Sequence, residues 1–263
     1  MEVEINIEVG TRLVNIPVSV NNQGPFSFHF DTGASTTTLS KNLAERLGIP
    51  TYDGTKSNAR GLGGEIPTQF AKATVSLGAL SFDEEELYVI DLDKIMPGAG
   101  HRDGVLGYST LKHCTLSLSY SRKTIRIGRD GLRFSNSNSA IDWNHFKYIK
   151  DSHLIGVPVE INGQGPFDFV LDTGAGNTVI TPNLAQRIGL NAEPVMGIAR
   201  GLGGDVELKM AFPDFLSVGD IRLDSPQIAV IDLTKVSPKG NLIENGIIGF
   251  DFLRSLETII DYP

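Results

Sequence analysis

The stretch Phe30-Asp31-Thr32-Gly33-Ala34-Ser35 decides how this chain folds, because the chain contains it twice. Its second copy is Leu171-Asp172-Thr173-Gly174-Ala175-Gly176, and the two aspartates are 141 positions apart. Each copy places one carboxylate directly after an apolar run and directly before a glycine, a pattern that predicts the end of a buried strand. A single Asp-Thr-Gly triplet is expected by chance in roughly one chain in twenty of this length. Two copies with matching flanks therefore indicate an internal repeat.

The repeat extends over nearly the whole chain. Residues 13–26 match residues 154–167, and both read as a strand, an Asn/Gly turn and a second strand that ends at the aspartate. A short helix is predicted after each aspartate, because Ser40 and Thr181 stand in N-cap positions and a glycine follows eight residues later in both halves. Three further pairs of segments match, namely 60–65 with 200–205, 89–92 with 230–233, and 103–107 with 245–249.

A polar segment between the repeats predicts the domain boundary. Residues 128–131 and the Ser/Asn run 135–139 are rich in turn formers. We therefore expect an N-terminal lobe over residues 1–130, a linker over 131–150 and a C-terminal lobe over 151–263. The second half has no counterpart of the strand expected at 124–127, so the N-terminal extension or the linker is expected to supply one.

Composition excludes several classes of function. The 263 residues carry a formal net charge of -8 without a Lys/Arg cluster, which argues against nucleic acid and anionic membranes as partners. The single cysteine, Cys114, excludes an internal disulfide framework and is expected to be a small buried apolar residue. The N-terminus alternates acidic and apolar residues, which predicts a strand rather than a signal peptide. The chain as written is expected to be soluble, and the same pattern is compatible with an export signal that has been removed.

The carboxylates are the remaining candidates for chemistry. The five histidines form no His-Glu-x-x-His motif, and no Gly-x-Ser-x-Gly or phosphate-binding glycine loop is present. Two carboxylates about 4 Å apart repel by roughly 4 kcal/mol at an effective dielectric constant of 20, which raises one pKa of the pair by about three units. Such a pair holds one proton and can hydrolyse an amide by general acid-base catalysis, without metal or cofactor.

These motifs resemble the aspartic proteases of the retroviral-protease and pepsin type. The paired Asp-Thr-Gly-Ala segments, the Gly-Leu-Gly-Gly loops and the triplets at 105–107 and 247–249 carry the resemblance, once in each half. Among such enzymes the chain is most similar to microbial ones in which two retropepsin-like units are fused. The resemblance implies an all-β, bilobal acid-protease fold with two pseudo-twofold-related β-barrel lobes and a short helix in each.

The resemblance also implies roles for individual residues. Asp31 and Asp172 become the catalytic dyad, and Thr32 and Thr173 interlock beneath it. Ser35 is expected to donate a hydrogen bond to Asp31, with no counterpart at Gly176, so that Asp31 is mainly the ionised partner. The glycine loops become flaps over the substrate, although each loop alone also reads as an ordinary surface hairpin. The supporting and flap residues are Gly33, Gly174, Gly61, Leu62, Gly63, Gly64, Gly201, Leu202, Gly203 and Gly204.

The chain departs from the family pattern after the apolar-apolar-Gly triplets. Retroviral enzymes place there an arginine that braces acidic residues of the active-site loop, whereas this chain has Tyr108-Ser109 in one half and Phe250-Asp251 in the other. The first half therefore lacks an acid that the second half has.

The sequence thus predicts an aspartic endopeptidase that acts as a monomer on peptides in an extended conformation, held by strand-like main-chain hydrogen bonds. Two alternatives remain open at this point. One is a peptide-binding or scaffolding module with little turnover on the same fold. The other is a processing protease restricted to one partner.

Overall fold

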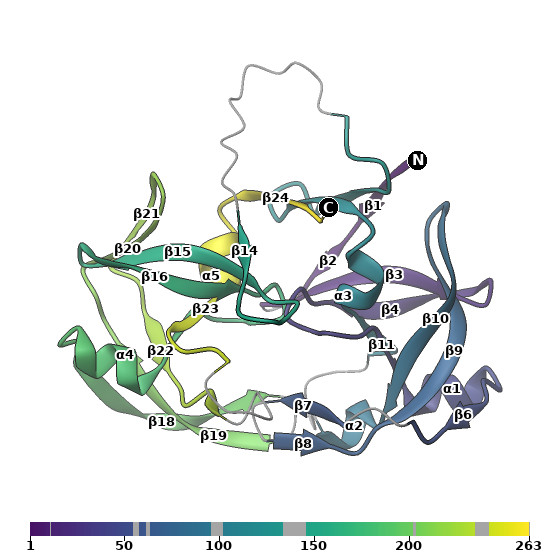
Figure 1. Ribbon diagram of the computed structural model, residues 1–263, viewed down its shortest axis with the longest axis horizontal. Coiled ribbons are helices and arrows are strands. Elements are labelled where there is room, and N and C mark those ends of the chain that lie inside the picture. Colours follow the sequence, from purple (N-terminus) through teal and green to yellow (C-terminus); the bar gives the residue numbers. More distant parts are fainter. Residues whose placement is uncertain are drawn as a thin grey trace.

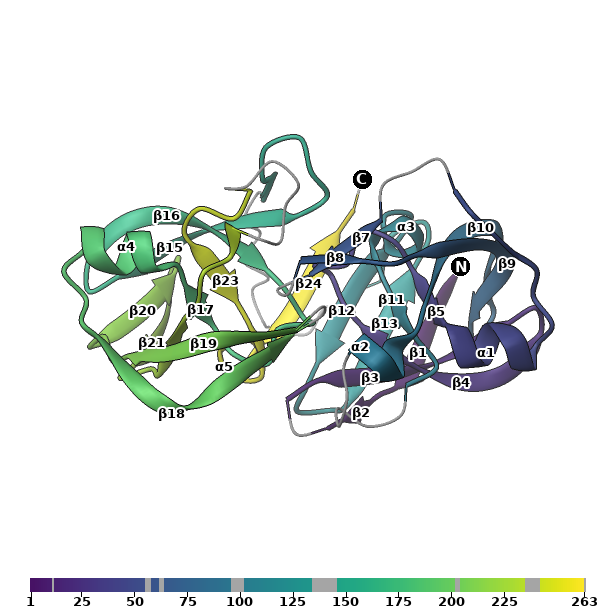
Figure 2. The same cartoon turned by 90° about the horizontal axis from the view of Figure 1, so that it is seen from below.

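The computed structural model describes residues 1–10, 12–54, 58–61, 64–95, 102–133, 146–201, 204–234 and 242–262. Strands dominate, and every helix within these ranges is short, which confirms the predicted all-β class. Two lobes lie side by side, with a sheet shared between them (Figures 1 and 2). No helix in the described part of the chain has the length and apolar character needed to cross a membrane.

The N-terminal lobe is built on an eight-stranded sheet. Its strands follow the order β2-β3-β4-β11-β5-β10-β9-β6, and an extra pairing between β3 and β9 closes the sheet into a barrel. The strands are β2 (Glu8–Val9), β3 (Val14–Val20), β4 (Gln23–Phe30), β5 (Thr38–Ser40), β6 (Thr51–Tyr52), β9 (Gln69–Leu77), β10 (Leu80–Ile90) and β11 (Gly104–Leu106). A separate hairpin, β7 (Ala59–Gly61) and β8 (Gly64–Ile66), projects from this lobe.

The C-terminal lobe repeats this arrangement in a ten-stranded sheet, in the order β18-β19-β22-β17-β23-β16-β15-β20-β21, with β14 paired to β15. The strands are β14 (Lys147–Tyr148), β15 (Ile155–Ile161), β16 (Gln164–Leu171), β17 (Val179–Ile180), β18 (Ala192–Gly201), β19 (Gly204–Ala211), β20 (Phe215–Val218), β21 (Ile221–Asp224), β22 (Ile228–Val230) and β23 (Gly246–Ile248).

The closing strand of the second lobe is interrupted, so the predicted barrel is present as such only in the first lobe. The repeat aligns β9 with residues 210–218, where the chain instead forms the end of β19, a break and β20. Pro213 lies in this break and has no N–H to donate to a neighbouring strand. After the break, β20 pairs with β15 just as β9 pairs with β3.

The predicted helices after the two aspartates are confirmed. Helix α1 (Lys41–Arg46) is capped by Ser40, whose side chain accepts a hydrogen bond from the N–H of Leu43. Helix α4 (Pro182–Arg187) is capped in the same way by Thr181 and begins with a proline, a residue favoured there because its φ suits the first turn. The remaining helices are α2 (Leu92–Ile95), α3 (Tyr108–Leu111) and α5 (Phe250–Leu253).

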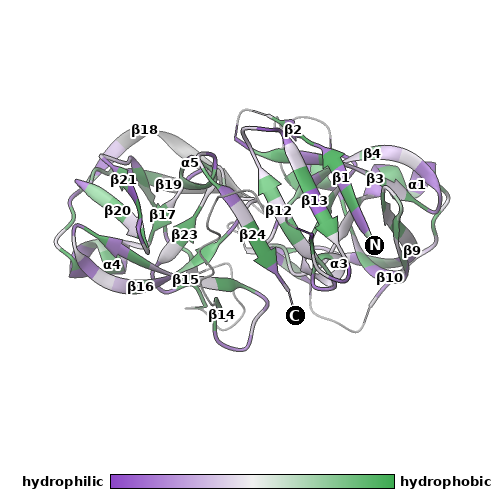
Figure 3. Cartoon of the chain, turned by 90° about the horizontal axis from the view of Figure 1, so that it is seen from above, coloured by the Kyte–Doolittle hydropathy of each residue, from purple (hydrophilic) through white to green (hydrophobic). Residues whose placement is uncertain are grey.

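Both lobes contribute to a four-stranded sheet in the order β1 (Glu2–Asn6), β13 (Thr124–Gly128), β12 (Thr115–Ser119) and β24 (Glu257–Asp261). Seen from above, this sheet runs across the junction of the lobes (Figure 3). The sequence led us to expect that either the N-terminal extension or the linker adds a strand to the second half. The N-terminal extension does form a strand, but β1 pairs with β13 of its own lobe rather than with β24. The predicted linker contributes β14, which extends the sheet of the second lobe.

Apolar packing crosses the boundary between the lobes. One core cluster includes residues from both halves, and the predicted buried cysteine, Cys114, belongs to it. Tyr120, from the N-terminal lobe, packs edge-on against Phe250 at a centroid distance of 5.3 Å. Its repeat counterpart, Tyr262, packs against Tyr108 at 5.7 Å. This exchange of aromatic rings fixes the position of one lobe against the other.

Candidate active site

Each aspartate follows the last residue of a central strand. Phe30 at the end of β4 pairs with Leu106 of β11, and the N–H of Asp31 donates to the carbonyl of Leu106 at 3.1 Å. In the second lobe the N–H of Asp172 donates to the carbonyl of Ile248 at 3.0 Å. The sequence builds the same short loop twice, because a buried apolar strand runs into Asp-Thr-Gly in both halves.

The two loops meet at the junction of the lobes. The two carboxyl groups, of Asp31 and Asp172, hydrogen-bond to each other. Each glycine of the motif lies against the aspartate of the other lobe. A methyl group added at Gly33 would be 2.7 Å from Cγ of Asp172, and one added at Gly174 would be 2.4 Å from Cγ of Asp31. Only glycine leaves room for the opposite carboxyl group at this distance.

The threonines interlock beneath the carboxyl groups. The hydroxyl of Thr32 donates to the carbonyl of Leu171 at 3.0 Å and accepts from the N–H of Thr173 at 3.1 Å. The hydroxyl of Thr173 donates to the carbonyl of Phe30 at 3.1 Å and accepts from the N–H of Thr32 at 3.0 Å. Every one of these bonds joins the two lobes, so the relative position of the loops is set by buried hydrogen bonds.

Burial and mutual repulsion govern the protonation of the pair. Removal from water raises the pKa of both carboxyl groups, and the nearby charge of Asp31 raises the pKa of Asp172 further, to about 8. Backbone N–H groups favour the charged forms: those of Gly33 and Ala34 both donate to Oδ1 of Asp31 at 2.9 Å, and that of Gly174 donates to Oδ1 of Asp172 at 2.8 Å. The pair therefore holds one proton, preferentially on Asp172.

The asymmetry between the aspartates does not come from Ser35, as the sequence led us to expect. The Ser35 hydroxyl lies 3.5 Å from the hydroxyl of Thr36, and no hydrogen bond joins it to Asp31 among the described residues. The additional donor to Asp31 is the backbone N–H of Ala34, which is a feature of the loop conformation and not of side-chain identity. Asp31 is the more readily ionised aspartate, as predicted, but the donor responsible is a backbone N–H and not the Ser35 hydroxyl.

A second layer of hydrogen bonds supports each loop. In the second lobe the Asp251 carboxylate accepts from the N–H of Thr178 at 2.8 Å and from its hydroxyl at 2.6 Å. At the equivalent place in the first lobe, the Ser109 hydroxyl accepts from the N–H of Thr37 at 3.0 Å. The hydroxyl of Thr37 turns instead to Thr110, at 2.8 Å. Two hydroxyl groups thus replace the carboxylate that the first half lacks.

Three residues near the loops were missed by the sequence analysis, which set the histidines aside. Arg12 and His153 occupy equivalent positions in the repeat, and each crosses to the other lobe. A guanidinium N–H of Arg12 donates to the side-chain carbonyl of Asn177, and Nε2 of His153 lies 2.8 Å from the carbonyl of Gly33. The third residue is His29, which is buried in β4 two positions before Asp31. Arg12 and His153 could have been found from the sequence, because a polar residue stands at this position in both halves of the repeat.

The predicted flaps correspond to two hairpins. In β7–β8, Arg60 faces Glu65 and Gly61 faces Gly64, and in β18–β19 the same pairing recurs for 200–205 and 201–204. Both hairpins lie on the side of the molecule opposite the four-stranded sheet and extend toward the middle (Figure 1). The predicted flap residues Leu62, Gly63, Leu202 and Gly203 lie outside the described residues.

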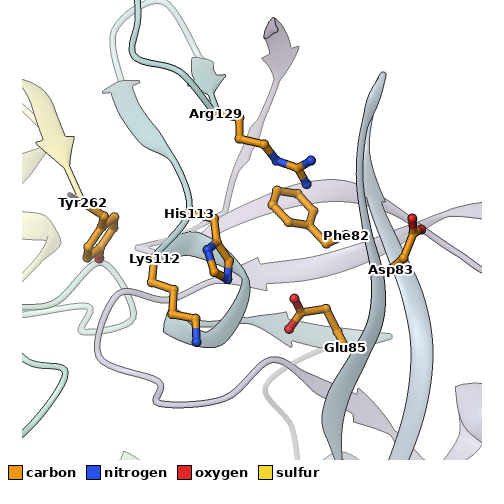
Figure 4. Close-up of a pocket in the computed structure, with 7 residues that line it drawn as sticks. All are labelled: Phe82, Asp83, Glu85, Lys112, His113, Arg129 and Tyr262. Carbon is orange, nitrogen blue, oxygen red and sulfur yellow. The ribbon is translucent and has the colours of Figure 1, made fainter.

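A cavity of about 510 Å³ has none of the predicted site residues in its lining (Figure 4). It is lined by Phe82, Asp83, Glu85, Lys112, His113, Arg129 and Tyr262. The Arg129 guanidinium covers the Phe82 ring, and burial raises the pKa of Glu85. Within the described ranges, no group of three or more His, Cys, Asp or Glu side chains is placed to hold a metal ion.

Two β lobes that each present an Asp-Thr-Gly loop at their junction define the aspartic proteases as a class. A model of the aspartyl protease family matches residues 16–110 and 157–252, more than half of the chain, so this protein belongs to that family and carries its unit twice. Among solved structures, the chain is similar to the EIAV protease complexed with the inhibitor HBY-793, with 23% identity, coverage of 37% of this chain and 84% of that chain, and a TM-score of 0.30. The comparison with curated proteins gave no match.

Proposed function

We propose that this protein is an aspartic endopeptidase in which Asp31 and Asp172 activate a water molecule to hydrolyse peptide bonds. The observation that carries the proposal is the buried, hydrogen-bonded carboxyl pair, in which the pKa of both members is raised. Buried carboxyl groups that share a proton are unfavourable for stability, and such perturbed groups concentrate at functional sites. Membership of the aspartyl protease family supports the same conclusion.

The asymmetry of the pair assigns the roles. Asp31, whose charge is favoured by two N–H donors, takes a proton from water while the water oxygen bonds to the peptide carbonyl carbon. Asp172 donates its proton to the carbonyl oxygen as that oxygen becomes a hydroxyl. When the tetrahedral hydrate collapses, the C–N bond breaks, the proton held by Asp31 passes to the leaving nitrogen, and Asp172 recovers its own.

The substrate class follows from the surrounding strands. An extended peptide would lie between the aspartates and the hairpins β7–β8 and β18–β19, which offer strand-like main-chain hydrogen bonds. Both halves of the site belong to one chain, so the active species is a monomer composed of the lobes 1–130 and 151–263. A size-exclusion measurement of the active fraction tests this part of the proposal.

The test uses the purified protein with denatured protein substrates and a peptide library from acidic to neutral pH. Asp31→Asn and Asp172→Asn should each lower kcat by more than about 10³-fold, because proton transfer by positioned groups contributes typically 10²–10⁴-fold. Asp220→Asn, at an exposed turn position, is the matched control and should leave kcat unchanged. Wild-type turnover in either dyad variant would refute the assignment.

The same experiment distinguishes the alternatives. A peptide-binding module would bind library peptides without forming products, and the dyad variants would bind them equally well. A protease restricted to one partner would leave the library intact but would still bind a statine-type inhibitor, whose hydroxyl mimics the tetrahedral hydrate. That binding would be lost in Asp172→Asn.

A further inference from the structure

The imidazole of His29 lies beneath the aspartate loops. His29 belongs to β4, where its neighbours Phe28 and Phe30 are buried in the lobe core, so its side chain leaves the opposite face of the strand. Only 5% of the residue is exposed. Its Nδ1 lies 3.0 Å from the carbonyl of Val14, and since a carbonyl only accepts, Nδ1 carries the proton of the neutral ring.

The other ring nitrogen is buried without a partner. Nε2 of His29 has no hydrogen bond of ordinary geometry among the described residues. The backbone of Gly174, in the Asp172 loop of the other lobe, also interacts with the ring and favours its protonated form. Because Nδ1 is already bonded to Val14, we assign this interaction to the Gly174 carbonyl and Nε2. In the neutral ring a lone pair therefore faces a second acceptor. Protonation turns Nε2 into a donor and removes this mismatch.

The equivalent contact to the other loop is already formed. Nε2 of His153, from the C-terminal lobe, lies 2.8 Å from the carbonyl of Gly33 and therefore donates to it. The ring of His153 rests against Tyr108 of the N-terminal lobe, with 5.6 Å between centroids. Each Asp-Thr-Gly loop thus has a histidine of the opposite lobe at its glycine carbonyl, and only one of the two bonds exists while His29 is neutral.

We propose that His29 is a proton-dependent positioning residue, which on protonation ties the Gly174 carbonyl to the N-terminal lobe and so fixes the Asp172 loop in acid. This inference rests on the proposed function for its effect on catalysis, but the hydrogen bond itself does not depend on turnover. The protonated ring bonds Val14 and Gly174 at once and thereby joins strand β3 to the opposite active-site loop. The Asp172 carboxyl group then has a fixed orientation at the pH at which an acid protease works.

The charges around His29 set the pH of this change. Burial is the largest influence and lowers the pKa of His29, the positive charge of Arg102 lowers it as well, and Asp172 opposes both effects, so that the resulting pKa is about 4. In return, the protonated ring lowers the pKa of Asp172 and favours its ionised form. Through the proton shared with Asp172, Asp31 is linked to the same change. The ring is therefore neutral at neutral pH and charged only in the acidic range.

The direct test is a histidine NMR titration of the wild-type protein with ¹⁵N-labelled imidazoles. Near pH 7 we expect the His29 ring as the Nδ1–H tautomer, and below about pH 4 a new Nε2–H signal protected from exchange with solvent. An Nε2–H tautomer near pH 7, a titration at the ordinary value of histidine, or an unprotected Nε2–H in acid would each overturn the proposal.

The catalytic test compares pH profiles. His29→Phe keeps the volume of the ring, and His29→Val introduces the residue that the repeat has at position 170. If either variant folds, the acid limb of its kcat profile should move to higher pH by up to about one unit, while KM changes little. The reason is that the positive charge of the protonated ring lowers the pKa values of the coupled carboxyl pair, and the variants lack this charge. His113→Gln, at an exposed position, is the control and should keep the wild-type profile. An unmoved acid limb in the His29 variants would refute the positioning role.

The two proposals fail separately. A protein that hydrolyses no peptide but gains the protected Nε2–H signal in acid would overturn the proposed function and leave the His29 contact standing. A protein that cleaves peptides with an acid limb unaffected by His29→Phe would leave the proposed function standing and overturn the positioning role of His29.

Discussion

Gly174→Ala tests the closest contact in the active site. A methyl group at this position would lie 2.4 Å from Cγ and 2.5 Å from both carboxyl oxygens of Asp31, about 1 Å inside ordinary van der Waals contact. The carboxyl group cannot yield freely, because its Oδ1 accepts hydrogen bonds from the N–H groups of Gly33 and Ala34 at 2.9 Å. Gly174 does not have a positive φ, so the substitution acts through this contact and not through backbone strain.

The displacement gives the magnitude of the effect. Moving a catalytic group by about 1 Å lowers the rate on the order of 10²-fold, and overfilling a packed site lowers the free energy of unfolding by about 1–3 kcal/mol. We therefore expect kcat of Gly174→Ala to fall at least about 100-fold, with a smaller change in KM, and the urea midpoint to decrease.

A nearby glycine supplies the control. At Gly176, two residues further along the same loop, the nearest atom to an added methyl group would be Cβ of Arg12 at 3.2 Å, which a shift of a few tenths of an ångström relieves. Peptide hydrolysis and urea denaturation of Gly176→Ala should therefore resemble those of the wild type. Wild-type kcat and an unchanged midpoint in Gly174→Ala, or equal losses in both variants, would refute the packing argument.

Three further predictions concern stability. Thr32→Val should lower the free energy of unfolding by about 2–4 kcal/mol, because it leaves a buried N–H and a buried carbonyl of the other lobe without partners, whereas Thr32→Ser should lose less than about 1 kcal/mol; equal losses in urea denaturation would contradict this. Asp251→Ala should destabilise the protein by about 1–3 kcal/mol. Ser109→Ala should destabilise it less, because it removes fewer hydrogen bonds. The reverse order would contradict the idea that Asp251 supports its loop more strongly than Ser109 does. The pKa of Asp172 is raised from 3.8 to about 8, so the stability that this group contributes is full below pH 3.8 and is lost as the pH rises through 8. Asp172→Asn should therefore be more stable than the wild type at pH 8. Thermal unfolding of both proteins across this pH range checks the prediction.

The sequence alone determined the elements that depend on short segments of chain. A buried strand that runs into Asp-Thr-Gly, a hydroxyl cap before each helix and an Asn/Gly turn before β4 and β16 each act within a few residues. Since the same segments recur at a fixed spacing, the repeat also indicated that Asp31 and Asp172 belong together. Family resemblance added the interlock of Thr32 with Thr173, which the structure places between the lobes.

Tertiary structure alone decided the conformation of the aspartate loops and the contacts made across the junction of the lobes. The donor that favours the charge of Asp31 is the N–H of Ala34, which depends on loop geometry rather than on the identity of a side chain. His29 and His153 looked like isolated histidines in the sequence, because each reaches a glycine of the opposite lobe more than a hundred residues away. Such contacts arise only when two packed lobes exclude water between them, so burial and partner are properties of the assembled junction and no local pattern records them.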